Sequence, residues 1–341
     1  MSLSKCRLLG GTGILVSEIG FGAWGIGGVT PGPTSYGNTN DKDSRRALRC
    51  ALENEINFYD TSNLYGDGHS EILIGETFKG VRDRVIIATK AGLLKYNHPP
   101  DFSEKAIRNS LVGSLRRLQT DYIDILQYHN PPKELFQEND TTLNFIQKLK
   151  QKGEIRAFGV SIRDPDDGYA VLEKLKPDAI QVNFNLLDHR ILDGGLMAKA
   201  GENGTSIIAR TPLCFGFLTG ELAIGMSFES FDHRSRWPQK QIDTWIKGGQ
   251  QMLGCMSDSS KQTSSQFALS FCLSFPEITV TIPGMMREEE VFENAKASDR
   301  AFLSKKELED IGKVYNEHNG FFAEKTTQTI KENDPGKVDG R

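Results

Sequence analysis

Eight short apolar stretches, each followed by a segment with helical periodicity, constrain the fold of this 341-residue chain more than any other feature. The apolar stretches are rich in β-branched residues and predict strands at residues 18–22, 56–60, 85–90, 122–129, 157–161, 179–183, 206–210 and 279–283. The segments after them predict helices at residues 41–53, 70–78, 103–118, 141–151, 166–175, 187–201, 259–274 and 288–297. Alternating strands and helices form parallel sheets, and eight such units favour a closed (β/α)8 barrel, a single domain of residues 1–341. An open, doubly wound sheet is the alternative that the same alternation allows.

Three segments fall outside the eight units. Residues 7–16 predict a β-hairpin that turns at residues 10–13 and closes the amino-terminal end of the barrel. Residues 211–254, after the seventh strand, are too many for one loop, and long loops at the carboxyl end of a barrel usually bind or cover a ligand. Residues from about 320 to 341 are polar, and we expect them to form a loosely held tail.

Composition and charge argue against several classes of function. The chain is 38% hydrophobic and 25% charged, as soluble proteins are, and 41 basic against 45 acidic residues give a net charge of −4. This charge argues against a dedicated nucleic-acid binder, and no apolar run approaches the roughly 18 residues that span a bilayer. The amino terminus lacks an apolar signal segment, and the five scattered cysteines form no Cys-x-x-Cys pair. We therefore expect a cytoplasmic protein with free thiols and no metal site, either a monomer or a small homo-oligomer.

A glycine motif near the start, Gly20-Phe21-Gly22-Ala23-Trp24-Gly25, matches the G-x-G-x-x-G pattern of dinucleotide-binding loops. In those loops a helix begins at once, because its N-terminus holds the pyrophosphate. Here the chain continues through residues 26–33, whose glycines and prolines preclude a helix. The motif therefore predicts a strand that leads into a long loop.

Ionisable side chains stand at the ends of three consecutive strands. Asp60 ends the second strand, Lys90 the third and His129 the fourth, and Tyr65 follows in the loop after Asp60. Taken singly, each has a structural interpretation, such as capping for Asp60, a surface position for Lys90 and packing for His129. Alternation along the strands, however, points the three terminal side chains into the barrel. Together with Tyr65 they predict a carboxylate, an amine, an imidazole and a phenol at the mouth where barrel enzymes carry their chemistry.

These four groups are suited to delivering a proton to a carbonyl. A lysine ammonium lowers the pKa of a neighbouring phenol, and a carboxylate keeps the lysine charged. An imidazole at the rim can hydrogen-bond a carbonyl oxygen and orient it. Since no Cys/His or Ser/His nucleophile pair accompanies the cluster, a hydride from a bound cofactor is the natural complement at the carbonyl carbon.

Short motifs spread over nearly the whole chain resemble those of the aldo-keto reductase superfamily in sequence and in order. They are residues 19–25 (IGFGAWG), 60–66 (DTSNLYG), 88–90 (ATK), 126–129 (LQYH), 159–161 (GVS), 181–183 (QVN), 210–213 (RTPL), 216–220 (GFLTG), 282–284 (IPG) and 291–294 (VFEN). Each motif is weakly specific alone, and their common order and spacing carry the resemblance. The resemblance implies a barrel that binds a nicotinamide dinucleotide without a Rossmann fold. It also implies reduction of an aldehyde, ketone or sugar carbonyl, or oxidation of the alcohol in reverse.

The resemblance further implies roles for individual residues. Tyr65 would be the general acid, tuned by Lys90 and Asp60, and His129 would orient the carbonyl. Ser161 and Gln181 would hydrogen-bond the nicotinamide carboxamide, and Arg210 stands where many members stack an aromatic ring on the nicotinamide. The other implied cofactor contacts are Gly22, Ala23, Trp24, Asp60, Thr211 and Pro212, with Leu213, Gly216, Leu218 and Gly220 along the pyrophosphate and Gly284, Met286, Arg287, Glu290, Glu293 and Asn294 at the adenosine end.

Two departures from the superfamily pattern concern the cofactor. Ile162 stands where many members have Asn, which removes one carboxamide hydrogen bond. At the adenosine end, Arg287 lies one place later than the basic residue that the resemblance leads us to expect, and Glu290 stands where some members have Arg. We expect NADPH as the coenzyme, with NADH as the alternative.

The predicted substrate pocket is lined by Trp24, Tyr65, His129, Phe215, Arg234 and Trp237. Arg234 and Arg236 beside Trp237 favour an anionic or sugar-like substrate, or else they fold the excursion back onto the barrel. Two further functions stay open. One is a cofactor-binding regulatory subunit with little turnover, and the other is an isomerase or aldolase that uses Lys90 as a Schiff base.

Overall fold

Eight parallel strands form the centre of the computed structural model, which describes residues 5–30, 34–96, 98–136, 140–257, 261–299, 302–318 and 321. They are β3 (Phe21–Gly22), β4 (Phe58–Asp60), β5 (Ile86–Ala91), β6 (Ile123–His129), β7 (Ile155–Ser161), β8 (Ala179–Asn183), β9 (Ser206–Arg210) and β10 (Ile278–Ile282). Each strand pairs in parallel with the next along the chain. Bridges from Ile19 to Thr281 and from Gly22 to Gly284 join the first strand to the last, so the sheet closes into a barrel. The predicted (β/α)8 barrel is confirmed, and the open doubly wound sheet is wrong.

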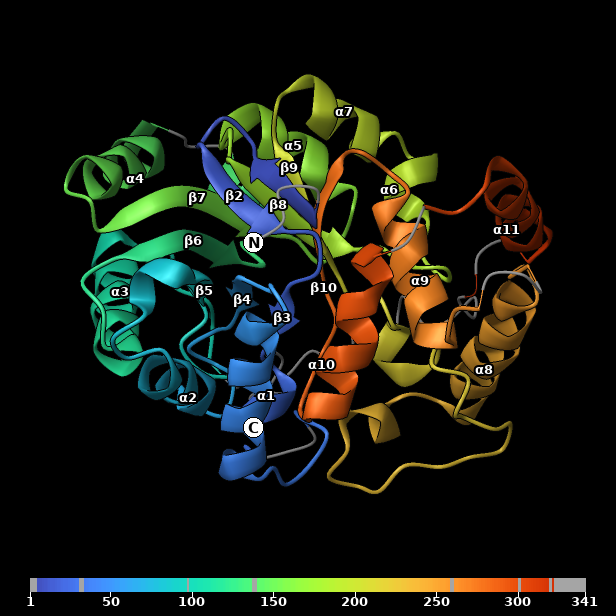
Figure 1. The fold of residues 1–341 in the computed structure, drawn as a ribbon. Helices are drawn as coiled ribbons and strands as arrows, with labels where there is room; N and C mark the ends of the chain where they lie inside the picture. Colours follow the sequence, from blue (N-terminus) through green and yellow to red (C-terminus); the bar gives the residue numbers. More distant parts are fainter. Residues whose placement is uncertain are drawn as a thin grey trace, which may run out of the picture.

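Helices follow the strands in turn and surround the barrel (Figure 1). They are α1 (Asp41–Glu53), α2 (His69–Thr77), α3 (Glu104–Leu118), α4 (Asp140–Gln151), α5 (Asp167–Lys174), α7 (Leu196–Glu202), α9 (Ser264–Leu273) and α10 (Glu288–Ala295). Side-chain caps determine where several of them begin. Asn40 caps α1, Ser103 caps α3, and Thr263 forms a capping box with Gln266 at the start of α9.

Some helices differ from the sequence-based prediction. The predicted helix 187–201 is divided into α6 (Arg190–Asp193) and α7, because Gly194 and Gly195 intervene and Gly195 adopts a φ of +75°. The excursion after β9 contains α8 (Gln239–Leu253), and α11 (Lys305–Glu317) follows α10; the prediction includes neither. The expected tail at residues 320–341 lies outside the described residues except for Phe321, which is buried and whose carbonyl accepts a hydrogen bond from Gln241 Nε2 at 2.9 Å.

The amino-terminal hairpin fills one end of the barrel, as predicted. β1 (Cys6–Leu9) and β2 (Ile14–Ser17) pair in antiparallel register. Their inward residues form one buried cluster with the inward residues of the strands, including Leu9, Ile14, Val16, Phe58, Ile125, Ala157 and Val280. Since this end is packed with apolar side chains, the polar residues of the barrel interior lie toward its carboxyl end.

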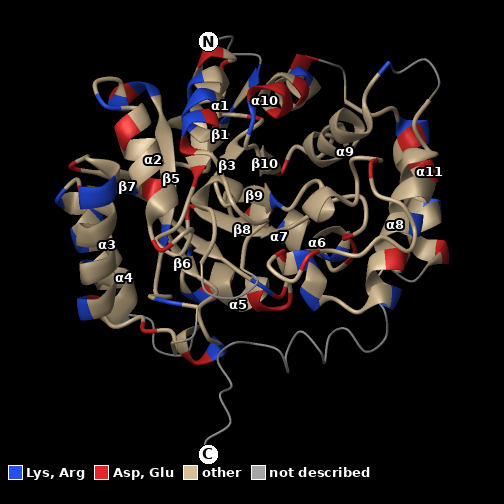
Figure 2. Ribbon diagram, turned by 90° about the horizontal axis from the view of Figure 1, so that it is seen from below, with Lys and Arg blue, Asp and Glu red and all other residues tan. Residues whose placement is uncertain are grey.

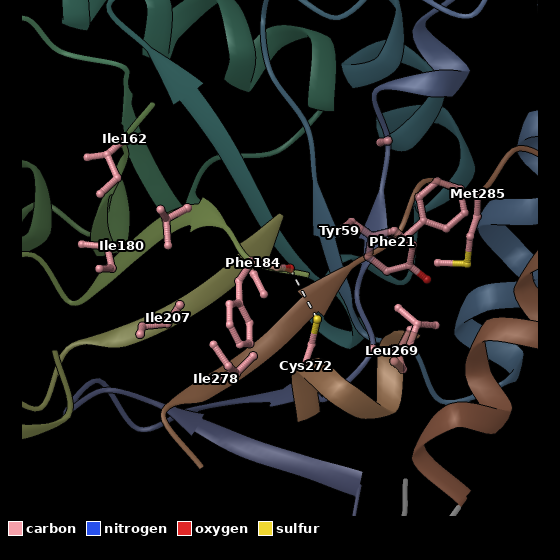
Figure 3. Close-up of a cluster of buried hydrophobic side chains, with 14 of the residues drawn as sticks. Phe21, Tyr59, Ile162, Ile180, Phe184, Ile207, Leu269, Cys272, Ile278 and Met285 are labelled. Carbon is pink, nitrogen blue, oxygen red and sulfur yellow. Dashed lines mark hydrogen bonds between the residues drawn. The ribbon is translucent and has the colours of Figure 1, made fainter. Parts of the chain in front are cut away.

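A second apolar layer lies between the strands and the helices. Figure 3 shows part of it, where Ile180 and Ile207 of the sheet lie near Phe184 and Cys272. The Cys272 thiol donates to Phe184 O at 3.4 Å. Burying an aliphatic side chain fully contributes about 1.5–3 kcal/mol, so this layer holds the strands, and with them the residues at the strand ends, in place.

Charged residues lie mainly on the outer helices. Figure 2 shows both signs on α8 and α11, whereas β8 and β10 carry neither. Within the described ranges, no helix has the length and apolar character needed to cross a membrane. All five cysteines are free thiols. The expected oligomeric state and cellular location stay predictions.

A buried histidine connects α11 to the barrel. His189, in the loop after β8, stacks on Tyr315 of α11 with ring centroids 3.8 Å apart, and on Phe271 of α9 at 4.9 Å. Its backbone N–H also donates to Tyr315 Oη at 3.1 Å. Burial lowers the pKa of His189 from 6.5 to about 3, so the ring is neutral in the folded protein at pH 7.

The fold should therefore lose stability in mild acid. The unfolded chain protonates His189 below pH 6.5, whereas the folded chain resists protonation until about pH 3, so the free energy of unfolding decreases as the pH falls through this window. At pH 5 this contribution is about 2 kcal/mol. In His189→Phe, which keeps the stacking, urea unfolding should show a correspondingly smaller loss between pH 7 and pH 5. His98→Gln, at an exposed position, is the control, and an unchanged pH dependence in His189→Phe would contradict the assignment.

Candidate active site

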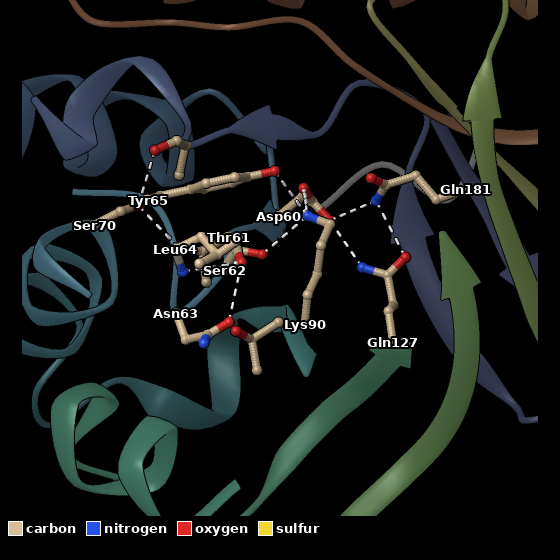
Figure 4. A network of polar contacts seen from close by, with 12 residues as sticks. Asp60, Thr61, Ser62, Asn63, Leu64, Tyr65, Ser70, Lys90, Gln127 and Gln181 are labelled. Atoms are coloured by element: carbon tan, nitrogen blue, oxygen red, sulfur yellow. Dashed lines mark hydrogen bonds and ion pairs between the residues drawn. The ribbon is translucent and has the colours of Figure 1, made fainter. Parts of the chain in front are cut away.

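Ionisable side chains meet at the carboxyl end of the barrel. Asp60 ends β4, Lys90 is the second-to-last residue of β5, His129 ends β6, and Tyr65 lies in the loop between β4 and α2. Figure 4 shows Asp60, Tyr65 and Lys90 in one hydrogen-bonded network. The structure thus brings the predicted carboxylate, phenol and amine into contact, and the charge of Lys90 acts on His129.

Lys90 is at the centre of this network. Its ammonium group, only 1% exposed, donates to Asp60 Oδ1 at 2.5 Å, to Thr61 O at 3.0 Å and to Tyr65 Oη at 3.0 Å. Burial disfavours the charged form, but Asp60 and Tyr65 together outweigh it and raise the pKa of Lys90 above its ordinary value. Lys90 is therefore an ammonium at neutral pH. This argues against the Schiff-base function, which requires a neutral amine.

The pKa of Tyr65 is shifted upward overall, which the sequence did not predict. Burial raises the pKa of Tyr65 by more than the Lys90 ammonium lowers it, and the net direction is upward from 10. Lys90 does lower this pKa as expected, but the net direction is upward because removing water from a phenolate outweighs the effect of the ammonium. Tyr65 is therefore protonated at neutral pH, and the ammonium 3.0 Å away can stabilise its oxygen when the proton leaves.

His129 presents a neutral ring to the same mouth. Burial, and then the charges of Lys90, Arg210 and Arg163, hold the pKa of His129 well below 6.5. Its Nδ1 is buried and has no hydrogen-bond partner among the described residues. Among the residues that the structure describes, no group of three His, Cys, Asp or Glu side chains is placed to hold a metal ion. His129 is thus available for hydrogen bonding to a ligand.

The polar residues expected to hold a nicotinamide lie on the next three strands. Ser161 ends β7, Gln181 lies within β8, and Arg210 ends β9. Arg210 Nη2 donates to Ile162 O at 3.0 Å, while its Nε is buried without a partner among the described residues. Burial lowers the pKa of Arg210 to about 10, which still leaves it charged at pH 7. A planar cation near Tyr65 that keeps one unused donor is compatible with stacking on a nicotinamide ring.

Two polar residues at this end are missing from the predicted set. Gln127 of β6 donates to Asp60 Oδ2 at 2.9 Å, and its two-residue spacing from His129 is the signal that places it on the inward face. Tyr96, in the loop after β5, accepts a hydrogen bond from Trp24, and burial followed by the proximity of Tyr65 raises the pKa of Tyr96. Nothing in the sequence of that loop distinguishes Tyr96.

The segment after β9 has an unusual backbone. Thr211, Cys214 and Phe215 have φ values of +55°, +44° and +56°, which L residues rarely adopt. Asn183 Oδ1 accepts from the Thr211 hydroxyl at 3.0 Å, and Asn185 Nδ2 donates to Thr211 O at 3.0 Å. Strained backbone of this kind is concentrated at ligand-binding sites. The predicted pyrophosphate contacts lie on or beside this segment: Leu213, Gly216, Leu218 and Gly220. The segment also contains Pro212, another of the predicted coenzyme contacts.

The predicted adenosine contacts lie along α10 and in the segment just before it. Arg287 Nη2 pairs with Glu290 Oε1 at 2.9 Å, and Glu290 Oε2 accepts from Met286 N at 2.7 Å. Glu293 Oε1 accepts from the Thr263 hydroxyl at 2.6 Å, and Asn294 is buried. Because Gly284 bridges Gly22, the predicted contacts Gly22, Ala23 and Trp24 adjoin those near α10.

Aromatic rings gather on the side of β3. Trp24 and Phe215 both contact His233, with ring centroids 4.6 Å and 5.1 Å away, and Phe215 contacts Trp237 at 5.0 Å. Arg234 pairs with Asp232 at 2.7 Å and lies over the ring of Phe228, with its guanidinium carbon 4.1 Å from the centroid. The guanidinium carbon of Arg234 also lies 5.1 Å from the ring centroid of Tyr36, outside the excursion. This contact favours the interpretation in which Arg234 folds the excursion onto the barrel, and its contact with substrate stays a prediction.

Comparison with known proteins identifies the family. Residues 18–316 match the family model described as Aldo/keto reductase family. L-galactose dehydrogenase from Arabidopsis thaliana is 31% identical over 321 residues, which cover 92% of this chain and 91% of that protein. The holo form of an aldo-keto reductase from Bacillus halodurans superposes with a TM-score of 0.75 at 27% identity, covering 91% of this chain and 96% of that one. An aldo-keto reductase from Klebsiella pneumoniae in complex with NADPH gives 0.66 at 25% identity, covering 91% and 95%. This chain belongs to the aldo/keto reductase family and is an NAD(P)H-dependent oxidoreductase.

Proposed function

We propose that this protein reduces an aldehyde, ketone or sugar carbonyl with NADPH, and oxidises the alcohol in reverse, with Tyr65 as the proton donor. The observation that carries the proposal is the buried Lys90 ammonium, which contacts Asp60 Oδ1 at 2.5 Å and Tyr65 Oη at 3.0 Å. This arrangement combines a protonated phenol with a fixed positive charge beside its oxygen. Such a pair is suited to releasing a proton to a carbonyl oxygen.

The proposed reaction forms one C–H and one O–H bond and breaks the C=O π bond. Tyr65 gives its proton to the carbonyl oxygen, and Lys90 stabilises the negative charge that develops on Tyr65 Oη. Asp60 keeps Lys90 charged and in position, and the neutral His129 donates a hydrogen bond that orients the carbonyl. When bound, the nicotinamide coenzyme supplies a hydride to the carbonyl carbon. Tyr65 then regains a proton from solvent.

Several groups support binding of the coenzyme. Gln181 and Ser161 would hold the carboxamide, and Arg210 would stack on the ring. Arg287 is the cation among the predicted adenosine contacts, and it is 68% exposed, so a phosphate could reach it and share it with Glu290. The NADPH complex of the Klebsiella pneumoniae relative also supports NADPH as the coenzyme.

Replacing Tyr65 by Phe should abolish most of the reduction without weakening the coenzyme complex. Loss of a positioned proton donor lowers the rate by roughly 10²–10⁴-fold. The measurement is NADPH oxidation with a panel of aldehydes, alongside fluorescence titration with NADPH. Tyr59→Phe is a matched control, because Tyr59 Oη donates to Ile56 O in the outer layer, away from the site. Near-full activity in Tyr65→Phe would disprove its role, and a wild-type protein that binds NADPH but oxidises none would favour a regulatory subunit.

The position of Tyr65 depends on close approach of a glycine. A Cβ at Gly27, in the turn Gly25–Gly27 after β3, would lie 2.8 Å from the carbonyl carbon of Tyr65 and 2.9 Å from Gly66 N. Gly27→Ala should therefore displace the Tyr65 loop and lower the reduction rate by about tenfold or more. Gly11→Ala, whose new methyl group would have no neighbour within 4 Å, should retain full activity. Equal activities of the two variants in the NADPH oxidation assay would refute this dependence.

Arg287→Ala should weaken binding of NADPH and leave binding of NADH unchanged. A charge-assisted contact to the 2′-phosphate at an exposed position is expected to contribute about tenfold in affinity. Fluorescence titration with each coenzyme measures the effect, and NADH serves as the internal control. Equal losses for both coenzymes would show that Arg287 does not contact the 2′-phosphate.

A further inference from the structure

We propose that Gln127 is a positioning residue that fixes the orientation of the Gln181 amide and connects it to Asp60. The inference rests on the proposed function, in which Gln181 binds the carboxamide of the nicotinamide. It concerns a residue that lies outside the four ionisable groups and outside the predicted coenzyme contacts. Gln127 would act through Gln181 and Asp60, without touching the substrate.

Gln127, Gln181 and Asp60 form a closed, buried triangle of hydrogen bonds. Gln127 Nε2 donates to Asp60 Oδ2 at 2.9 Å, and Gln181 Nε2 donates to the same oxygen at 2.6 Å. Gln181 Nε2 also donates to Gln127 Oε1 at 3.1 Å, which closes the triangle. All three side chains are buried, so these bonds are not exchanged freely for bonds to bulk water.

The carboxylate of Asp60 determines which way each amide points. A carboxylate paired with an ammonium only accepts hydrogen bonds, so the atoms that face Asp60 Oδ2 must be amide nitrogens. Gln181 Nε2 carries two hydrogens, of which one is directed to Asp60 and the other to Gln127. Gln181 therefore offers its carbonyl oxygen to a ligand, and Figure 4 shows this oxygen pointing away from Gln127. The Gln181 carbonyl oxygen can therefore accept a hydrogen bond from the N–H groups of the nicotinamide carboxamide.

The barrel places the three side chains in one layer. Asp60, Gln127 and Gln181 come from β4, β6 and β8, and alternate strands of such a barrel contribute to the same interior layer. Gly159 of β7 leaves room for Gln127, because a Cβ there would lie 2.9 Å from Gln127 Cγ. Without Gln127, Gln181 would keep a single bond to Asp60, and its second hydrogen would have no partner in the triangle.

A coenzyme analogue can test this orientation directly. In 3-acetylpyridine analogues of NADPH a methyl ketone replaces the carboxamide, so the analogue keeps the oxygen and loses the N–H donors. The wild-type protein should bind NADPH more tightly than the reduced analogue, as measured by fluorescence titration. Gln127→Met, which is similar in length but lacks the polar atoms, should reduce this ratio of affinities by about three- to tenfold. A purely structural role for Gln127 would weaken both ligands equally and leave the ratio unchanged.

Matched variants complete the experiment. Ile125→Val, on the same face of β6 two residues earlier, should keep the wild-type ratio. Gln181→Met should lose the discrimination itself, and adding Gln127→Met to it should change the ratio no further, because the two residues act as a unit. Should Gln127→Met fail to fold, Gln127→Asn replaces it, since its shorter side chain keeps the polar group but cannot reach both partners.

The possible outcomes separate this inference from the proposed function. An unchanged ratio in the Gln127 variants, or independent effects in the double variant, overturns the role of Gln127 even if wild-type turnover is normal. If the wild-type protein binds NADPH but reduces no carbonyl, the proposed function fails while the binding ratios still decide the role of Gln127. A wild-type protein that does not distinguish NADPH from the analogue overturns the inference, and one that binds neither overturns both.

Discussion

The burial of the Lys90 ammonium is the constraint on which the arrangement of the site depends. A charge removed from water costs several kcal/mol unless it is paired and its donors are satisfied. Lys90 donates to three acceptors, which are Asp60, the carbonyl of Thr61 and the hydroxyl of Tyr65. Asp60 is itself buried, and its second oxygen accepts from Gln127 and Gln181. Compensation of this one buried charge therefore involves the phenol of Tyr65 on one side and the amides of Gln127 and Gln181 on the other.

The barrel meets this need because parallel strands end at the same edge. The hairpin fills the opposite end with Leu9, Ile14 and Val16, so the interior changes from apolar to polar along the barrel axis. The loop that carries Tyr65 is held from outside, where the Ser70 hydroxyl donates to Ala23 O at 2.8 Å and contacts Thr61 Oγ1 at 2.9 Å. Packing against α2 thus holds the Tyr65 loop next to Asp60 and Lys90, although none of these three residues lies on a helix.

Burial affects the protonation of Tyr65, His129 and Lys90 in different ways. It raises the pKa of Tyr65 and lowers that of His129, so both groups are neutral at pH 7. Lys90 stays charged because Asp60 and Tyr65 together outweigh burial. A positive charge beside a neutral phenol and a neutral imidazole is consistent with the proposed proton transfer to a carbonyl oxygen.

The sequence by itself determined the barrel, its hairpin and the positions of Asp60, Tyr65, Lys90 and His129 along the strand ends. These features follow from local rules, since alternation sets which face a residue occupies and parallel strands share one carboxyl edge. The net pKa direction of Tyr65, the triangle of Gln127 with Gln181 and Asp60, and the attachment of α11 through His189 were decided only by the tertiary structure. The physical reason is that desolvation and hydrogen-bond partners depend on segments far apart in the chain. No local pattern in the sequence records how closely such segments approach one another.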